Sequence, residues 1–197
     1  MMDFSVTLPA WVHPRVAAEP EIFPDVEARM RFAIRLAQEN IERGTGGPFG
    51  AGVFDAEGRL IAPGVNLVAS SNCSILHAEM VAIALAQQSL GRYDLSDGGA
   101  VEHELTTSTE PCAMCFGAIP WSGVTRLVCG ARDAHARAIG FDEGPKLADW
   151  QAALETRGIS VVRDILADEA AAVLEYYRDQ GGMIYNAGKG HVGADRC

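Results

Sequence analysis

The sequence has little positive charge and no long apolar segment. Sixteen Lys and Arg stand against 26 Asp and Glu in 197 residues, which gives a net charge of −10. Because nucleic-acid affinity rests mainly on clustered basic side chains, this charge disfavours tRNA and DNA as partners. No apolar stretch reaches about 18 residues, so no membrane-spanning helix is expected.

Cysteines are also few, and their number, five, is odd. Disulfide frameworks belong mainly to oxidising compartments, and the N-terminus has neither the basic region nor the apolar core of a secretory signal peptide. We therefore expect a cytoplasmic protein with reduced thiols. The 48% of hydrophobic residues can build one substantial core, which suits a single domain.

Prolines and glycines mark the two ends of the chain. Four of the nine prolines fall in the first 24 residues, so residues 1–25 are predicted to form an extended arm. Residues 26–180 are predicted to form the folded domain. Residues 181–197 hold five glycines around a small apolar segment, Met183–Tyr185, and are predicted to form a tail.

Hydrophobic periodicity predicts a mixed set of helices and strands. Met30, Ile34, Ala37 and Ile41 recur at steps of three and four, as expected of an amphipathic helix. The predicted helices are 26–43, 70–90, 112–121, 146–157 and 168–179, and the predicted strands are 49–54, 60–68, 104–108, 124–130 and 159–165. This order predicts an α/β three-layer fold, with a central mixed sheet of about five strands between helices.

Two short motifs, His77-Ala78-Glu79 and Pro111-Cys112-Ala113-Met114-Cys115, carry the candidate chemistry. Zinc favours nitrogen and sulfur ligands, and a catalytic zinc usually takes three from the protein and keeps one position open. His77, Cys112 and Cys115 supply such a set for Zn²⁺. The spacing of the two cysteines places both on one helix face, and the positive end of a helix dipole favours the thiolates that a metal requires.

Glu79 is expected to stay off the metal and to carry protons. His77 and Glu79 can reach one position only if it lies over the end of their helix, because a spacing of two points side chains apart on a regular helix. Zinc lowers the pKa of a bound water to about 7. A carboxylate can accept the water's proton and hand it to a ring nitrogen, so that hydroxide adds to an amidine-like carbon and ammonia leaves.

A closed structural zinc site is the alternative. Cys73 lies four residues before His77 and could complete a set of three cysteines and one histidine. Closed sites stabilise folds and catalyse nothing, and such a site would leave Glu79 without a role beside the metal. Cys129 is expected in the core, and Cys197 is expected to be a terminal thiol.

The combination of H-x-E with P-C-x-x-C resembles the cytidine deaminase-like superfamily. From about residue 26 onward the chain resembles the guanine deaminase branch of that superfamily. The segments that carry this resemblance are Gly46–Ala51, Val65-Asn66, Ala118–Val124 and Ile139–Gly144. The last segment distinguishes the branch from tRNA adenosine deaminases, which lack it and are usually more basic.

The resemblance implies roles for further residues. Asn66 would hydrogen-bond the base, and Glu143 would bring a second catalytic carboxylate to it. The remaining substrate contacts would be Phe49, Ala78, Asp142, Trp121 and Tyr185. On the residues alone, Asn66 is also typical of a turn, and adjacent carboxylates such as Asp142 and Glu143 are usually a solvated pair.

The resemblance further implies a homodimer, in which the glycine-rich tail can cross to the partner's site. The predicted reaction is zinc-dependent hydrolysis of guanine to xanthine and ammonia, with a small nucleobase as partner and neither nucleic acid nor membrane. Related substrates (guanosine, ammeline or cytosine) are alternatives of the same class. A non-catalytic zinc-stabilised module is the alternative of a different class.

Overall fold

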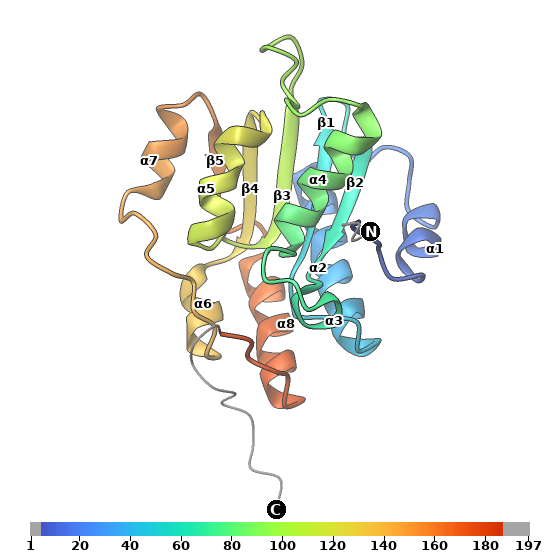
Figure 1. The fold of residues 1–197 in the computed structure, drawn as a ribbon, viewed down its shortest axis with the longest axis vertical. Helices are drawn as coiled ribbons and strands as arrows, with labels where there is room; N and C mark the ends of the chain where they lie inside the picture. Colours follow the sequence, from blue (N-terminus) through green and yellow to red (C-terminus); the bar gives the residue numbers. More distant parts are fainter. Residues whose placement is uncertain (1–4, 187–197) are drawn as a thin grey trace, which may run out of the picture.

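A computed structural model describes residues 5–186 and shows a five-stranded sheet between two layers of helices (Figure 1). The strands, in the spatial order β2-β1-β3-β4-β5, are β2 (Leu60–Val65), β1 (Gly50–Asp55), β3 (His103–Thr109), β4 (Arg126–Ala131) and β5 (Ser160–Val162). β1 pairs antiparallel with β2 and β3, whereas the β3–β4 and β4–β5 pairs are parallel. The predicted mixed sheet and three-layer fold are confirmed.

Helices cover both faces of the sheet (Figure 1). One face packs against α4 (Ala78–Leu90), α5 (Ala113–Ser122) and α7 (Trp150–Glu155), and the other against α2 (Val26–Glu42) and α8 (Ala167–Asp179). Shorter helices are α1 (Val12–Ala17), α3 (Val68–Ser71) and α6 (Asp133–Ala138). Within residues 5–186, no helix is long and apolar enough to cross a membrane.

The topology places loops from several strands at one end of the sheet. β3 runs parallel to β4, so the chain that follows both strands emerges at the same edge. The segment after β3 leads directly to Cys112 and α5, and the segment after β4 leads through α6 to the loop that carries Glu143. Ligands in α/β sheets bind at this carboxyl end of the parallel strands, and α4 begins at the same edge (Figure 1).

Within residues 5–25, the structure corrects the prediction of an extended arm. Residues Val12–Ala17 form α1, and the side chain of Val12 is fully buried in an apolar cluster with Phe32 and Leu36. Pro14 does not prevent this helix because it lies in the first turn, where the missing N–H would have no partner within the helix.

Other elements also differ from the prediction. The predicted helix 70–90 is interrupted, because Asn72 adopts a left-handed conformation (φ 48°) after α3 and the helix resumes only at Ala78. The sequence prediction missed α6, and β5 is only three residues long. The tail prediction can be compared only over residues 181–186, because residues 187–197, including Cys197, lie outside the described part of the chain.

Candidate metal centre and active site

Two helix N-termini bring three metal ligands together. His77 and Cys112 are the N-cap residues of α4 and α5. The Sγ atoms of Cys112 and Cys115 lie 3.5 and 3.6 Å from His77 Nδ1, and all three ligand atoms lie within 4.8 Å of one another. Tetrahedral zinc, with ligands at about 2.0–2.3 Å, would place them about 3.6 Å apart. The donor set and its spacing therefore fit one zinc ion.

The two cysteines are electrostatically unequal. A hydrogen bond from Cys115, together with one from His77, lowers the pKa of Cys112 to about 4. The same contact with Cys112, together with burial, raises the pKa of Cys115 well above its usual value. Burial alone would lower the pKa of His77, but its hydrogen bond to Cys112 and the nearby charges of Glu79, Cys112 and Glu143 raise it overall.

Two buried carboxyl groups face this thiolate. Burial, with the neighbouring Cys112 charge, raises the pKa of Glu79 to about 7. Burial also raises the pKa of Glu143 to about 8, with further contributions from Cys112 and Glu79. Anionic groups so close together repel one another, and a divalent cation at this position would stabilise them. This excess of buried acidic groups is a second observation that fits a bound zinc.

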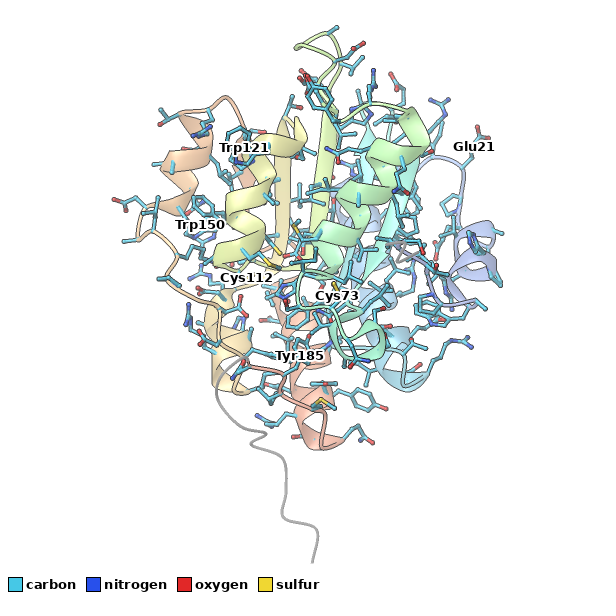
Figure 2. The ribbon with its side chains drawn as sticks, in the orientation of Figure 1. Glu21, Cys73, Cys112, Trp121, Trp150 and Tyr185 are labelled. Atoms are coloured by element: carbon cyan, nitrogen blue, oxygen red, sulfur yellow. The ribbon has the colours of Figure 1, made fainter. Side chains whose placement is uncertain are left out.

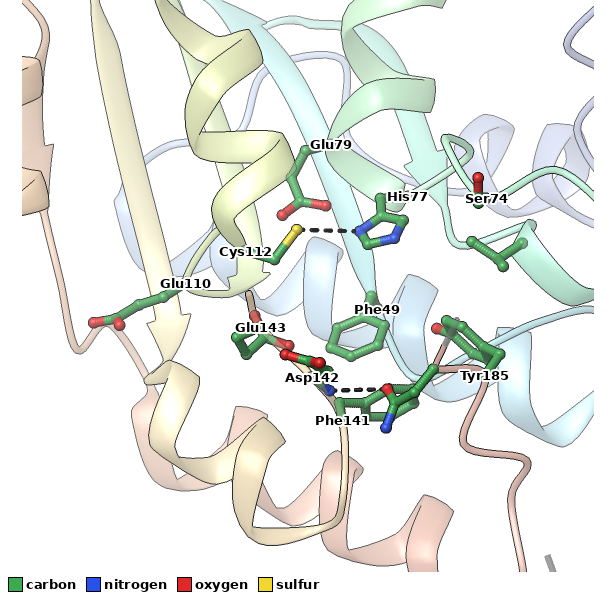
Figure 3. A pocket seen from close by; sticks show the side chains of 12 residues that line it. Phe49, Ser74, His77, Glu79, Glu110, Cys112, Phe141, Asp142, Glu143 and Tyr185 are labelled. Atoms are coloured by element: carbon green, nitrogen blue, oxygen red, sulfur yellow. Dashed lines mark hydrogen bonds between the residues drawn. The ribbon is translucent and has the colours of Figure 1, made fainter. Parts of the chain in front are cut away.

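The metal position opens into a cavity of about 240 Å³. Figure 3 shows His77, Cys112 and Glu79 on one side and Phe49, Phe141 and Tyr185 across from them. The ring centroids of Phe49 and Phe141 are 5.1 Å apart, and those of Phe141 and Tyr185 are 5.0 Å apart. The cavity therefore combines a polar, metal-binding wall with an aromatic wall.

Most of the predicted site residues meet at this cavity. Its lining contains Phe49, His77, Glu79, Cys112, Asp142, Glu143 and Tyr185, whereas Cys115 is buried behind Cys112. Asp142 is exposed at the rim, and Glu143 is buried, so the two are not a solvated pair. Tyr185 reaches the cavity of its own chain in this structure.

Asn66 is not part of the cavity lining but is fully buried beside it. Its backbone N–H donates to the Phe49 carbonyl at 3.1 Å, and its Oδ1 accepts from the Val68 N–H at 3.3 Å. Its Nδ2 has no hydrogen-bond partner among residues 5–186. An unpaired buried donor costs about 1–3 kcal/mol, and an acceptor on a ligand would remove that cost.

Trp121 does not lie in the cavity, which corrects its predicted placement in the substrate pocket. Figure 2 shows it at the end of α5 opposite to Cys112, and 80% of its surface is exposed. Ala78 is fully buried against apolar neighbours and does not line the cavity either. Cys73 packs against an apolar cluster and is not one of the grouped metal ligands, so the closed four-ligand site is not formed.

A buried ion-pair cluster that the sequence reasoning missed lies behind the metal ligands. Glu110 is buried and accepts a hydrogen bond of 2.6 Å from Arg163 Nε. Lys146 Nζ lies 3.7 Å from the Glu110 carboxylate and donates to the Pro111 carbonyl at 3.1 Å. Lys146 thus links the chain after Glu143 to the chain before Cys112. The sequence feature that could have indicated this cluster is an acidic residue, Glu110, directly after a buried strand.

Asn186 was also missed, and no pattern in the sequence marks it. Its Oδ1 accepts from the Asp142 N–H at 2.9 Å, and its Nδ2 donates to the Gly140 carbonyl at 2.9 Å. These two bonds attach the C-terminal segment to the loop that carries Glu143. The other unpredicted residues of the cavity lining are Val68, Ser74, Glu110 and Phe141.

A three-layer α/β fold with one His and two Cys ligands at helix N-termini, and a buried Glu beside them, defines a zinc-dependent hydrolytic deaminase. Residues 24–131 match the family described as the cytidine and deoxycytidylate deaminase zinc-binding region, and the chain belongs to this family. The predicted superfamily, enzyme class and zinc cofactor are confirmed.

Among solved structures, the chain is similar to guanine deaminase from Nitrosomonas europaea, with 45% identity and a TM-score of 0.84 over 90% of this chain and 97% of that chain. A structure of NE0047 in complex with 2,6-diaminopurine is 47% identical, with a TM-score of 0.85 over 93% and 96% of the two chains. The chain is also 42% identical to Bacillus subtilis guanine deaminase, over 59% of this chain and 71% of that protein.

Proposed function

We propose that this protein hydrolyses guanine to xanthine and ammonia. The observation that carries the proposal is the second buried carboxyl group, Glu143, which faces the metal ligands across a cavity of the size of a small ligand. The likeness to guanine deaminases, which extends over most of the chain, supports the same substrate. A mutant of a relative of 45% identity was solved in complex with 8-azaguanine, a close analogue of guanine.

The residues around the cavity have different roles in deamination. A zinc ion held by His77, Cys112 and Cys115 supplies activation of water at neutral pH. Glu79 is buried beside the ligands and lines the cavity, where it can take a proton from water and return it to the ring nitrogen next to the attacked carbon. The water oxygen replaces the amino group, which leaves as ammonia.

The other polar residues orient the base. In this proposal, Glu143 accepts hydrogen bonds from the N–H edge of guanine and assists proton transfer to the departing amino group. The unpaired Asn66 Nδ2 donates toward the opposite side of the ring. Phe49, Phe141 and Tyr185 flank the base and keep bulk water away from it. Asp142 lies at the rim of the cavity, where it limits the size of the ligand.

Cavity size and charge favour a free base over nucleic acid. A volume of about 240 Å³ lies below the roughly 300–1,000 Å³ typical of pockets for drug-sized ligands. The net charge of −10 repels polyphosphate. These two properties support a small-molecule substrate. The relatives also include tRNA-specific adenosine deaminases, such as that of Haemophilus influenzae (35% identity over 58% of this chain and 62% of that protein).

We also propose that the protein is a homodimer through the outer surface of α4 and α5. α5 contains no charged residue, and the one charged residue of α4, Glu79, is buried in the site. Helices that are apolar on all sides are usually covered on all sides. Gly117 and Trp121 are exposed on this surface, and a second copy of the chain would cover them.

Ammonia release from a panel of substrates tests the proposed reaction. The purified zinc-loaded protein is incubated with guanine, guanosine, ammeline, cytosine and adenine, and Glu79→Gln serves as the control for contaminating activity. We expect guanine to be the fastest substrate. Faster turnover of another member would reassign the substrate. Stoichiometric zinc without turnover of any member would support the non-catalytic zinc module instead.

A further inference from the structure

Asn40, in the last turn of α2, is a fully buried amide outside the cavity. Its Nδ2 donates to the carbonyl oxygens of Gly47 and Asn66, both at 2.9 Å. Its Oδ1 accepts a hydrogen bond from Thr45 Oγ1 at 2.7 Å. Both NH₂ hydrogens and the oxygen of this side chain are therefore used. The two carbonyls that it holds lie just before β1 and just after β2.

This hydrogen-bonded network continues to the N-terminal segment. Thr45 Oγ1 accepts from Trp11 Nε1 at 3.0 Å, and the guanidinium of Arg43 lies 5.5 Å from the centroid of the Trp11 ring. The next residue, Val12, is fully buried. The segment before α2 is thus anchored to Asn40 through one indole and one hydroxyl.

Asn66 is the point at which the network meets the site. Its backbone N–H is bonded to Phe49, its carbonyl to Asn40 and its Oδ1 to the Val68 N–H. Only Nδ2 is left without a partner within the described part of the chain. The direction of this unpaired donor therefore depends on how firmly the three other groups are held.

Gly46 and Gly47 show that the surrounding backbone is tightly packed. A Cβ on Gly46 would clash with the Asn66 carbonyl oxygen and lie 2.6 Å from Asn40 Nδ2, and a Cβ on Gly47 would clash with the Tyr185 hydroxyl. This stretch of backbone therefore lies against the Asn40–Asn66 contact and against an aromatic residue of the cavity. A shift of Asn66 would therefore also displace residues of the cavity wall.

We propose that Asn40 is a positioning residue that aims the Asn66 side chain at the substrate, and that Thr45 and Trp11 extend this support to the N-terminal segment. The inference rests on the proposed function, in which Asn66 binds guanine. Asn40 does not touch the cavity and acts through the carbonyl of Asn66. Loosening the network weakens binding of the base, while the metal ligands and Glu79 keep the turnover of bound substrate.

Thr45→Val removes the hydroxyl but keeps the shape of the side chain, and Thr45→Ser keeps the hydroxyl. The measurements are KM and kcat for guanine and the Kd of 8-azaguanine. We expect Thr45→Val to raise KM and Kd about fivefold, the effect of losing about one neutral hydrogen bond, with kcat nearly unchanged. Thr45→Ser should restore the parent values. Trp11→Phe, which removes the indole N–H, should act in the same direction as Thr45→Val.

A double-mutant cycle separates positioning from general loosening of the fold. If the network acts through Asn66, Thr45→Val should change the Kd by less than about twofold in an Asn66→Ala background. Leu154→Val, at a fully buried position of α7 and outside the apolar cluster on which Trp11 packs, is the matched control. It should lower the melting temperature without changing KM.

Two outcomes would overturn the inference. One is an equal effect of Thr45→Val in both backgrounds, and the other is a lower melting temperature with unchanged KM and Kd. If either occurs while the parent protein still deaminates guanine, only the positioning role fails. A parent protein that neither binds 8-azaguanine nor deaminates guanine would overturn the proposed function together with this inference.

Discussion

Cys112 and Cys73 are both cysteines near His77, but they have different surroundings. Cys112 lies 3.5 Å from His77 Nδ1 and its pKa is lowered to about 4, whereas Cys73 packs among apolar side chains. We expect Cys112→Ser to lose bound zinc and activity, because a hydroxyl is a poor zinc ligand. Cys73→Ser should retain both. Zinc content is measured by elemental analysis, and loss of zinc from Cys73→Ser would restore the closed-site hypothesis.

Glu79 is buried and lines the cavity beside the metal ligands, where its carboxyl group can transfer protons. Glu79→Gln keeps the size of the side chain but cannot carry the proton. We expect turnover to fall by about 100-fold or more, the usual scale for general acid–base catalysis, with zinc still bound. A variant that loses its zinc would instead identify Glu79 as a ligand, and full activity would exclude it from the chemistry.

Glu143 is the residue on which substrate choice depends in the proposed function. A buried polar group rejects ligands that leave it unpaired, so Glu143→Gln should reduce guanine turnover severely with zinc content and melting temperature unchanged. Asn66→Ala should mainly raise KM. Wild-type rates in Glu143→Gln would remove the main reason for choosing guanine over other amino-heterocycles.

At the level of elements, the site depends on how closely α4 packs on β2. A Cβ on Gly64 of β2 would clash with the Ala78 carbonyl oxygen and lie 2.7 Å from the Ala82 nitrogen, both of which are backbone atoms of α4. Because neither atom can rotate away, Gly64→Ala should displace the N-terminus of α4 and with it His77. We expect a loss of about 1–3 kcal/mol in the free energy of unfolding, as for other overpacked cores.

The displacement of α4 should also lower the affinity for zinc, so that a chelator removes the metal more easily. A loss of stability in a distant element would not have this effect. Gly117→Ala in α5 is the matched control, because a Cβ there meets nothing within 4 Å. Removal of a helical glycine is stabilising by roughly 0.5–1 kcal/mol. Thermal unfolding and chelator competition measure both effects. Unchanged zinc affinity in a destabilised Gly64→Ala variant would separate the packing of α4 from the metal site.

At the scale of the whole molecule, the apolar outer surface of α5 provides a test of the dimer. Gly117 is exposed and has room for a side chain, so Gly117→Arg should fold while placing a charge on the proposed interface. We expect the mass of a dimer for the parent protein and of a monomer for Gly117→Arg by light scattering. Gly117→Ala should remain a dimer. A monomeric parent protein would contradict the homodimer.

The amino-acid sequence by itself determined the layered fold, and it predicted the metal ligands and the proton carrier. These features depend on short-range patterns: the identities and spacing of His77, Cys112 and Cys115, and the hydrophobic periods of helices and strands. Pro111 and the apolar residues that follow it predict the α5 helix, with Cys112 at its N-terminus. Within each motif these signals involve neighbours within a few residues, so they can be read before any packing is known. That His77 and Cys112, 35 residues apart, share one metal was predicted from the combination of the two motifs.

The tertiary structure alone decided which distant residues complete the site. Trp121 and Cys73 lie in the right segments but face away, because the direction of a side chain depends on where its element ends and what it packs against. The contacts of Asn40 with Asn66 and of Lys146 with Pro111 join segments that are 26 and 35 residues apart. Their geometry exists only once the sheet has brought these segments together, because hydrogen bonds are effective over about 3 Å and no local pattern encodes such a distance.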